Sequence, residues 1–253
     1  MRTYYFISGL PRSGSTLLSS ILNQNPEFFS DISTPLENIC EMSINIITDS
    51  HNNNVISESQ RIDLIHGIFE GYYRKISSPV IFDLNRSWTK KTNLLNKVFP
   101  NTKILCPVRN ISSIINSFET LFSKNPLNSH GTLDYKKSIF TRCNTMMNPD
   151  SGLIGSSLSS LQEGYSANPE MIHFVEYENL CKDPERTMRG VYNFLERPYY
   201  PHDFNNVEYS NEIFDMSCGI KNMHKIRRVV EYKPPKYIIP PDIINNYNNL
   251  RFW

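Results

Sequence analysis

The sequence predicts an α/β fold with three layers, α/β/α, around a central parallel sheet. Short apolar runs recur along the chain, and each is followed by a stretch with the spacing of a helix. Strands that alternate with helices form parallel βαβ units, because each helix carries the chain back across the sheet. The length of 253 residues and the hydrophobic content of 39% allow a core of the size that this fold needs.

The predicted elements follow one another in a regular order. In the first helix, apolar residues stand at positions 17, 18, 21 and 22, which is the spacing of one helix face. Strands are predicted at residues 3–8, 80–82, 103–108 and 171–175, and the helices that follow them at 15–23, 89–98, 111–122 and 184–196. A strand-like run covers 28–32, and helical patterns with polar interruptions, expected to wall a cleft, cover 35–47, 57–76 and 135–167.

A single domain is expected over residues 1–253, with a helical insert at about 120–168. The segment of about 205–253 is rich in Asn, Tyr and Pro, which are typical of loops, so we expect it to wrap the domain with little regular structure. A basic cluster at 221–228 lies within this segment. The cluster makes the segment a candidate lid over an anion site.

Composition argues against several classes of protein. The net charge of +1 gives no overall positive field, so neither nucleic acid nor an anionic membrane is expected as a partner. The cysteines are odd in number and include no C-x-x-C pair, which predicts reduced, mostly buried thiols and no metal site. No apolar stretch has the length of a membrane span or the pattern of a signal peptide, so a cytoplasmic location is expected.

The first candidate site is the glycine loop from Gly9 to Gly14, between the first strand and the first helix. Such a loop points backbone N–H groups and the positive end of the helix dipole at one spot, which favours an anion. The spacing resembles a Walker A loop, but Ser15 stands where the lysine of that loop would be. Positive charge comes instead from Arg12, which predicts a phosphate ligand without a triphosphate chain. The residues expected to contact the ligand are Arg12, Ser13, Gly14, Ser15 and Thr16.

The second candidate site is Arg109, at the end of the strand predicted at 103–108. Ligands of open α/β sheets bind at the carboxyl ends of the strands. Ser117 lies eight residues later, about two turns along the next helix. An arginine at the strand end and a hydroxyl that reaches back from the helix are together suited to grip one further phosphate.

Together these motifs resemble the sulfotransferases that use 3′-phosphoadenosine 5′-phosphosulfate (PAPS), whose fold is similar to that of P-loop nucleoside triphosphatases. Residues 10–18 are similar to their 5′-phosphosulfate loop, in the Pro-Arg version found in tyrosylprotein sulfotransferases and in small bacterial and phage members. Arg109 and Ser117 are similar to their 3′-phosphate site. A third block, 175–180 followed by 183–185, is similar to their Y-E-x-L and D-P segment.

The resemblance implies a reaction and a set of roles. The expected reaction moves a sulfuryl group from PAPS to a hydroxyl or amine and leaves 3′-phosphoadenosine 5′-phosphate (PAP), without a metal. Arg12 is expected to neutralise charge on the bridging oxygen, and Arg86 to face the other sulfuryl oxygens. Tyr177 is expected against the adenine or a phosphate oxygen, and Arg227 as a donor that closes over the nucleotide. The acceptor stays open between a small molecule, a carbohydrate and a peptide, and no feature indicates the oligomeric state.

The sequence departs from the family pattern at two places. Ile111 stands two residues after Arg109, where the family often has Pro. Residues 25–37 do not reproduce the G-E-E stretch of tyrosylprotein sulfotransferases, so the resemblance does not assign the general base.

The general base is therefore predicted from local structure. The run 28–32 returns the chain from the first helix, and Pro35 suits a first helical turn, which places Glu37 in that turn at the ligand-binding edge of the sheet. Asp31 and Asp83 are the rival candidates.

Two other functions stay open. A P-loop kinase acting on a small molecule shares the fold and the loop, although the serine at position 15 argues against it. A nucleotide-binding module without catalysis fits if no base faces the site. The aromatic residues that are candidates for an acceptor cleft fit core packing equally well; they are Phe28, Phe29, Tyr72, Tyr73 and Trp88.

Overall fold

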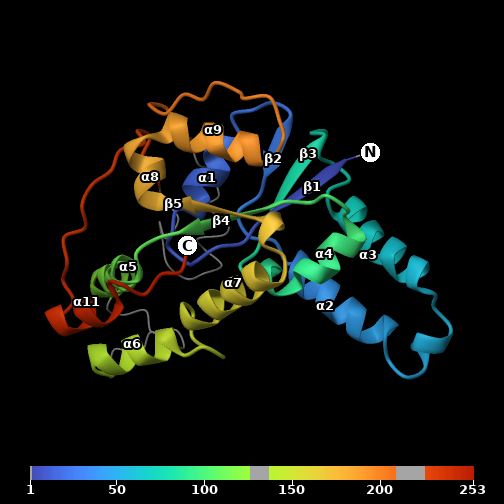
Figure 1. Cartoon of the computed structure of the whole chain (residues 1–253), viewed down its shortest axis with the longest axis horizontal. Coiled ribbons are helices and arrows are strands. Elements are labelled where there is room, and N and C mark those ends of the chain that lie inside the picture. Colours follow the sequence, from blue (N-terminus) through green and yellow to red (C-terminus); the bar gives the residue numbers. More distant parts are fainter. Residues whose placement is uncertain (1, 126–136, 209–225) are drawn as a thin grey trace.

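The computed structural model describes residues 2–125, 137–208 and 226–253. In these parts of the chain, five strands form one parallel sheet in the order β2-β3-β1-β4-β5 (Figure 1). The strands are β1 (Thr3–Ile7), β2 (Phe28–Ser30), β3 (Val80–Leu84), β4 (Ile104–Val108) and β5 (Ile172–Glu176). The predicted α/β fold with a central parallel sheet is confirmed.

The sheet is buried on both faces, which explains why its strands are near-continuous apolar runs rather than alternating ones. Strand β1 lies in the middle, where Ile7 is in register with Leu84 of β3 and with Leu105 of β4. On the far side of β4, Val108 is in register with Glu176 of β5. Because the strands are parallel, the loops that follow β1, β3, β4 and β5 all begin at the same edge.

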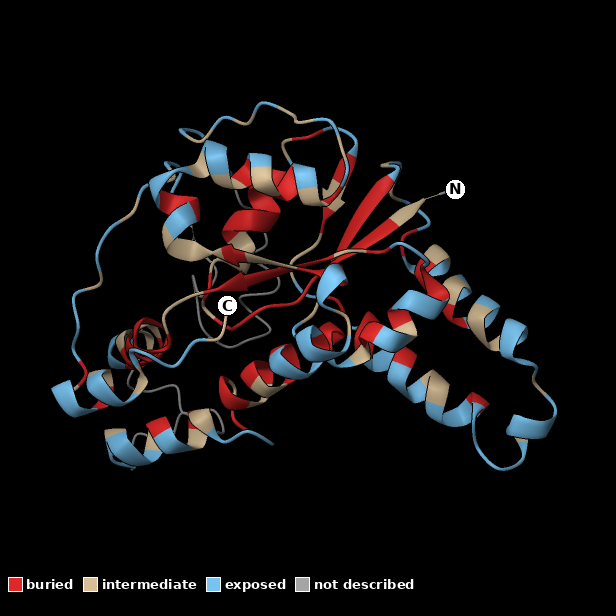
Figure 2. Cartoon of the chain, in the orientation of Figure 1, coloured by how far each residue is buried: buried red, intermediate tan, exposed pale blue. Residues whose placement is uncertain are grey.

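Helices cover the two faces of the sheet (Figures 1 and 2). One face packs against a core formed with α1 (Ser15–Leu22), α8 (Tyr177–Lys182) and α9 (Pro184–Phe194). The other face packs against the larger helical layer, and between the two layers β3 and β4 are entirely buried, whereas β5 at the edge of the sheet is partly exposed (Figure 2). The larger layer contains α2 (Leu36–Ile47), α3 (Glu58–Tyr72), α4 (Thr92–Val98), α5 (Ile111–Lys124), α6 (Ile139–Met147) and α7 (Gly155–Ala167).

Several predicted helices have different bounds in the structure. The pattern over 135–167 is two helices, α6 and α7, because the chain turns between them and Gly152 packs too closely for a side chain: a Cβ there would lie 2.4 Å from the Met146 carbonyl oxygen. The stretch predicted as a helix over 89–98 begins with a 3₁₀ turn, η2 (Trp88–Lys91). The remaining short 3₁₀ turns are η1 (Asn52–Asn54) and η4 (Pro169–Met171).

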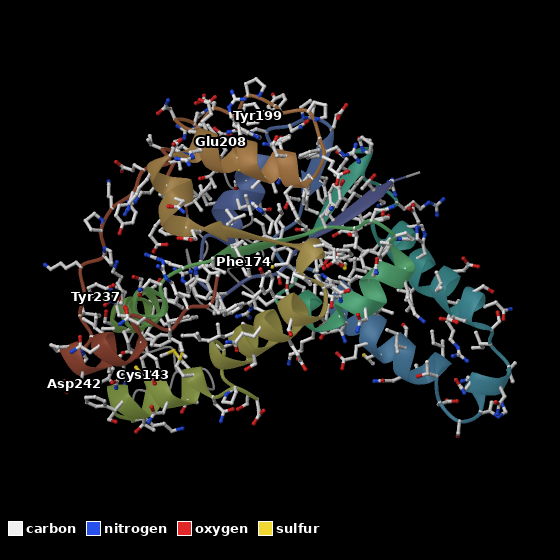
Figure 3. The ribbon with its side chains drawn as sticks, viewed as in Figure 1. Cys143, Phe174, Tyr199, Glu208, Tyr237 and Asp242 are labelled. Carbon is white, nitrogen blue, oxygen red and sulfur yellow. The ribbon has the colours of Figure 1, made fainter. Side chains whose placement is uncertain are left out.

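The described part of the tail is irregular apart from one short helix. It includes the helix α11 (Pro241–Tyr247), which lies beside α5. Tyr237 lies beside α5 (Figure 3), and its hydroxyl is 3.0 Å from Oγ of Ser113 in that helix. The Ile238 backbone N–H donates to Oδ1 of Asn116 at 2.8 Å. Paired polar contacts therefore hold this segment on α5. Residues 221–225 of the predicted basic cluster lie outside the described residues.

Candidate active site

In the glycine loop between β1 and α1, positive φ angles and close packing restrict which residue types fit. Gly14, the N-cap of α1, has φ 91°, and a Cβ there would lie 2.7 Å from Cδ2 of Tyr177. Arg12 is also left-handed, with φ 57°. The Ser13 hydroxyl, which is 1% exposed, lies 2.7 Å from the Pro107 carbonyl oxygen and so ties the loop to β4. These constraints fix the conformation of the loop. The N-terminus of α1, which follows the loop, has no side-chain cap.

Two arginines meet beside this loop. The Arg12 side chain reaches α5, where its Nε donates to Oγ of Ser117 at 3.2 Å. Arg109, at the end of β4, donates from Nη1 to the backbone oxygen of Arg12 at 3.3 Å. The two predicted anion sites are therefore in contact. Arg12 connects them, because it contacts both Ser117 and Arg109, whereas no direct hydrogen bond joins Arg109 to Ser117 in the described residues.

Arg109 is held from the side of β5 as well. Its guanidinium carbon lies 4.3 Å from the centre of the Tyr177 ring, and its Nε lies 3.9 Å from Oε1 of Glu178. Stacking of this kind fixes a guanidinium plane while leaving its N–H donors available. The Arg109 Nε is buried and has no hydrogen-bond partner among the described residues. The arrangement is suited to an anion.

Tyr177 and Arg227 lie near one another. Burial raises the pKa of the Tyr177 phenol, while the nearby charges of Arg109 and Arg227 act in the opposite direction. Arg227 is exposed, in the tail segment whose Arg228 carbonyl accepts from the Val207 N–H at 2.7 Å. The tail thus brings one cation toward the group formed by Gly14, Arg109 and Tyr177.

The other predicted ligand contacts are accessible. Ser15 and Thr16 begin α1 and are half-buried, so their backbone N–H groups lie in its first turn. Arg86 is exposed, in the turn between β3 and η2. Its place at the carboxyl end of β3 is the predicted one, and its role stays a prediction.

Glu37 lies in the first turn of α2, as predicted, and is 3% exposed. Its Oε1 is 3.2 Å from Nζ of Lys91, the last residue of η2. The lysine also lies 3.3 Å from Oε2 of Glu41, one turn farther along α2. A buried carboxylate paired with a lysine is thus present at the edge of the sheet where the glycine loop lies.

The rival Asp83 has a different environment. It is fully buried and accepts hydrogen bonds from the Tyr73 hydroxyl (2.6 Å), the Thr34 hydroxyl (2.7 Å) and Nε1 of Trp88 (2.6 Å). Burial raises the pKa of Asp83 to about 6, although the three hydrogen bonds oppose the shift. With its oxygens engaged inside the core, Asp83 organises structure and is badly placed to take a proton from a bound ligand.

The remaining predicted residues divide between core and surface. Asp31 is half-buried, and its Oδ1 accepts from the Ile32 backbone N–H at 2.7 Å. Phe28, Tyr73 and Trp88 are buried in the core. Tyr72 is 43% exposed and so is the aromatic residue of this set that a ligand reaches most readily.

The cysteines agree with the prediction of buried thiols where the structure describes them. Cys40, Cys106, Cys143 and Cys181 are free and buried, and burial raises their pKa values. Cys218 lies outside the described residues. Within the described residues, no group of three or more His, Cys, Asp or Glu side chains is placed to hold a metal ion. No helix in these parts combines the length and apolar character needed to cross a bilayer.

Residues 5–201, which include both arginine sites and the β5 block, match the family model described as "Sulfotransferase family". The chain belongs to the sulfotransferase family. A relative of this sulfotransferase in Caenorhabditis briggsae, described as "Putative protein-tyrosine sulfotransferase", is 24% identical over 197 residues. The match covers 77% of this chain and 65% of the relative, so the chain spans about two-thirds of the length of that relative.

Solved sulfotransferase structures share the fold. The sulfotransferase domain from the curacin biosynthetic pathway matches with a TM-score of 0.61 and 17% identity, over 100% of this chain and 92% of that one. The domain from the olefin synthase of Synechococcus PCC 7002 matches with a TM-score of 0.54 and 18% identity, over 100% and 89%. An Alicyclobacillus acidocaldarius sulfotransferase matches with a TM-score of 0.53 and 13% identity, over 80% and 85%.

Sequence reasoning missed Lys91, the partner of Glu37. Its one sequence signal is the basic pair Lys90 and Lys91, which reads equally well as a solvated surface. The pairing becomes visible when η2 and α2 are placed side by side, because the two residues are 54 positions apart.

Proposed function

We propose that this sulfotransferase uses PAPS as its donor, moves the sulfuryl group to a hydroxyl or amine of an acceptor, and releases PAP. The proposal rests on the placement of two arginines. Arg12 and Arg109 come from the ends of neighbouring strands and are joined at the backbone of Arg12, beside a glycine loop that has serine in place of the Walker lysine. Two arginines from different strand ends suit a nucleotide with separate 5′ and 3′ anionic groups better than a triphosphate chain.

The protein groups divide between the two ends of the donor. Backbone N–H groups of Gly14, Ser15 and Thr16 would bind the 5′-phosphosulfate, because they lie at the start of α1. Arg12, fixed by Ser117, would stabilise the negative charge that develops on the bridging oxygen, and Arg86 would approach the outer sulfuryl oxygens. These roles need positioned donors and no metal.

The other end of the donor would contact β4 and β5. Arg109 is the residue proposed for the 3′-phosphate, since its Nε is buried without a hydrogen-bond partner among the described residues. Tyr177 keeps its ring beside Arg109, and Arg227 would close from the tail. The proposed general base is Glu37, which would accept the proton of the acceptor as its oxygen attacks sulfur.

The acceptor is proposed at the level of chemistry. The Caenorhabditis briggsae relative carries a protein-tyrosine sulfotransferase description, so a tyrosine-containing peptide is the first acceptor to test. A phenol and an oligosaccharide represent the small-molecule and carbohydrate alternatives. The measurement is transfer of ³⁵S from labelled PAPS to each acceptor.

Thermal unfolding with nucleotides tests the proposed donor and needs no acceptor. PAP at about 100 times its dissociation constant should stabilise the protein by roughly 3 kcal/mol, because it binds only the folded state. ATP with Mg²⁺ should give a much smaller shift and no hydrolysis. Stronger stabilisation by ATP with steady hydrolysis would favour the kinase, and no response to either nucleotide would favour the module without catalysis.

A further inference from the structure

We propose that Lys91 is a positioning residue that holds Glu37 charged and correctly oriented as the general base. The proposal rests on the proposed function, and it concerns a residue that the resemblance does not mark. Lys91 is 19% exposed in its side chain, and Glu37 is 4% exposed in its own, so the ion pair is largely shielded from water.

Lys91 is important because Glu37 is buried. An unpaired carboxylate in such an environment is costly, and it would take up a proton instead of staying charged. Lys91 Nζ engages Oε1 at 3.2 Å, whereas no hydrogen bond from a described residue reaches Oε2. The lysine therefore stabilises the charge and leaves one oxygen for a proton.

Both partners are fixed by the same buried carboxylate. Asp83 accepts from Trp88, the first residue of η2, and from Thr34, three residues before Glu37. The Thr34 backbone is held as well, since its N–H donates to the Leu84 carbonyl at 3.2 Å. The segments that carry Lys91 and Glu37 are thus anchored at one point in the core.

A further contact links the pair to the phosphate loop. The Thr89 backbone N–H, two residues before Lys91, donates to Oγ of Ser8 at 3.1 Å. Ser8 immediately precedes the glycine loop, and it is 1% exposed. The turn that supplies the lysine is therefore anchored directly to the strand end that supplies Arg12.

The other groups around the pair do not replace Lys91 or Glu37. Glu41 also contacts Lys91, but its side chain is 55% exposed, so water screens that interaction. Burial, with the negative charges of Asp83 and Glu37, raises the pKa of the Cys40 thiol to about 12, so this thiol stays neutral and does not act as a base. Asp83 is occupied by its three donors.

In the proposed step, one bond to sulfur forms and one breaks. The acceptor oxygen forms a bond to sulfur while its proton passes to Oε2 of Glu37. The bond between sulfur and the bridging oxygen breaks, and its electron pair stays on the 5′-phosphate oxygen of PAP. Lys91 then favours loss of the proton from Glu37 to water, which restores the charged base.

The test uses water as the acceptor, because hydrolysis of PAPS to PAP and sulfate needs the same proton transfer. In the full chain, Lys91→Met should lower kcat for ³⁵S-sulfate release about 10- to 100-fold, as expected for a displaced catalytic group, with the KM for PAPS within about twofold. Lys91→Arg should restore most of the rate.

Two control variants and one double variant distinguish a positioning role of Lys91 from a purely structural role. Lys90→Met removes the neighbouring exposed lysine, and Glu41→Gln removes the exposed partner of Lys91; both should stay within about twofold of the wild type. Adding Lys91→Met to Glu37→Gln should cause no further loss, because Lys91 acts through Glu37.

Equal additional losses in the double variant, or a rate in Lys91→Arg that is no higher than in Lys91→Met, would overturn the assignment. Failure of the proposed function looks different. In that case the wild-type protein itself releases neither sulfate nor sulfated product from PAPS, and PAP does not raise its unfolding temperature.

Discussion

The two halves of the candidate site differ in how they are built. On the side of β1, β4 and β5, arginines are placed by short motifs at strand ends, and their contacts run to backbone oxygen, a hydroxyl and an aromatic ring. On the side of β3 and α2, the buried carboxylates of Glu37 and Asp83 and the partly buried Lys91 come from distant parts of the sequence. The first half is suited to hold an anionic donor, and the second to receive a proton.

Among substitutions in the two halves, the largest loss of turnover is expected at Glu37. Glu37→Gln should reduce turnover by roughly 10²- to 10⁴-fold, the usual range for loss of a general base, while PAP affinity stays within about twofold. Lys91 keeps Glu41 as a partner in this variant, so folding should be little changed. Steady-state rates with ³⁵S-labelled PAPS, together with PAP titration, make the comparison. Near-normal turnover would move the role of base to Asp31.

A loss on the donor side should rank next. Arg12→Gln removes the charge proposed to face the bridging oxygen, and turnover should fall by about 10²- to 10³-fold, as when one donor to a developing negative charge is lost. Glutamine, like arginine, is an unbranched residue without a special preference for the left-handed region, so the substitution should add no backbone strain at position 12. Arg189→Gln, on the exposed face of α9, is the control and should keep full turnover. A loss confined to KM would instead make Arg12 a binding residue.

A smaller effect is expected from Asp83, which supports the carboxylate half. Because folding raises its pKa from 3.8 to about 6, the folded state binds more protons in that interval, and stability should increase as pH falls through it. The difference in unfolding free energy between wild type and Asp83→Asn should shift toward the wild type by roughly 2–3 kcal/mol from pH 7 to 4. Urea unfolding at several pH values measures it. A difference that does not change with pH would show that Asp83 is charged to the same extent folded and unfolded.

The fold and the donor half were predictable from sequence for physical reasons. Parallel strands with both faces buried leave unbroken apolar runs, and Gly14 and Arg109 lie next to their strands, so local patterns locate them. The link from Ser117 to Arg12 was not predictable, because the spacing of Ser117 from Arg109 says nothing about which arginine lies closer across the sheet.

The carboxylate half was predictable only in part. Pro35 and the return of the chain through β2 correctly placed Glu37 in a first helical turn. Its partner Lys91 and the donors of Asp83 come from η2, α3 and the loop before α2, and no local pattern encodes contacts between such distant segments. The two helices within the predicted pattern over 135–167 were missed although Asn, Pro, Asp, Ser and Gly stand at positions 148–152, and such a run is typical of a turn.

Arg109 is proposed to bind the 3′-phosphate of a PAPS-type nucleotide, and calorimetric titration of two ligands tests this role. One ligand is PAP, and the other is adenosine 5′-phosphosulfate, which lacks that phosphate. Loss of one charge-assisted contact costs about 1.5–3 kcal/mol, so Arg109→Ala should weaken PAP about 10- to 100-fold and leave the other ligand within about twofold. Equal weakening of both ligands, or wild-type affinity for PAP in Arg109→Ala, would contradict the claim.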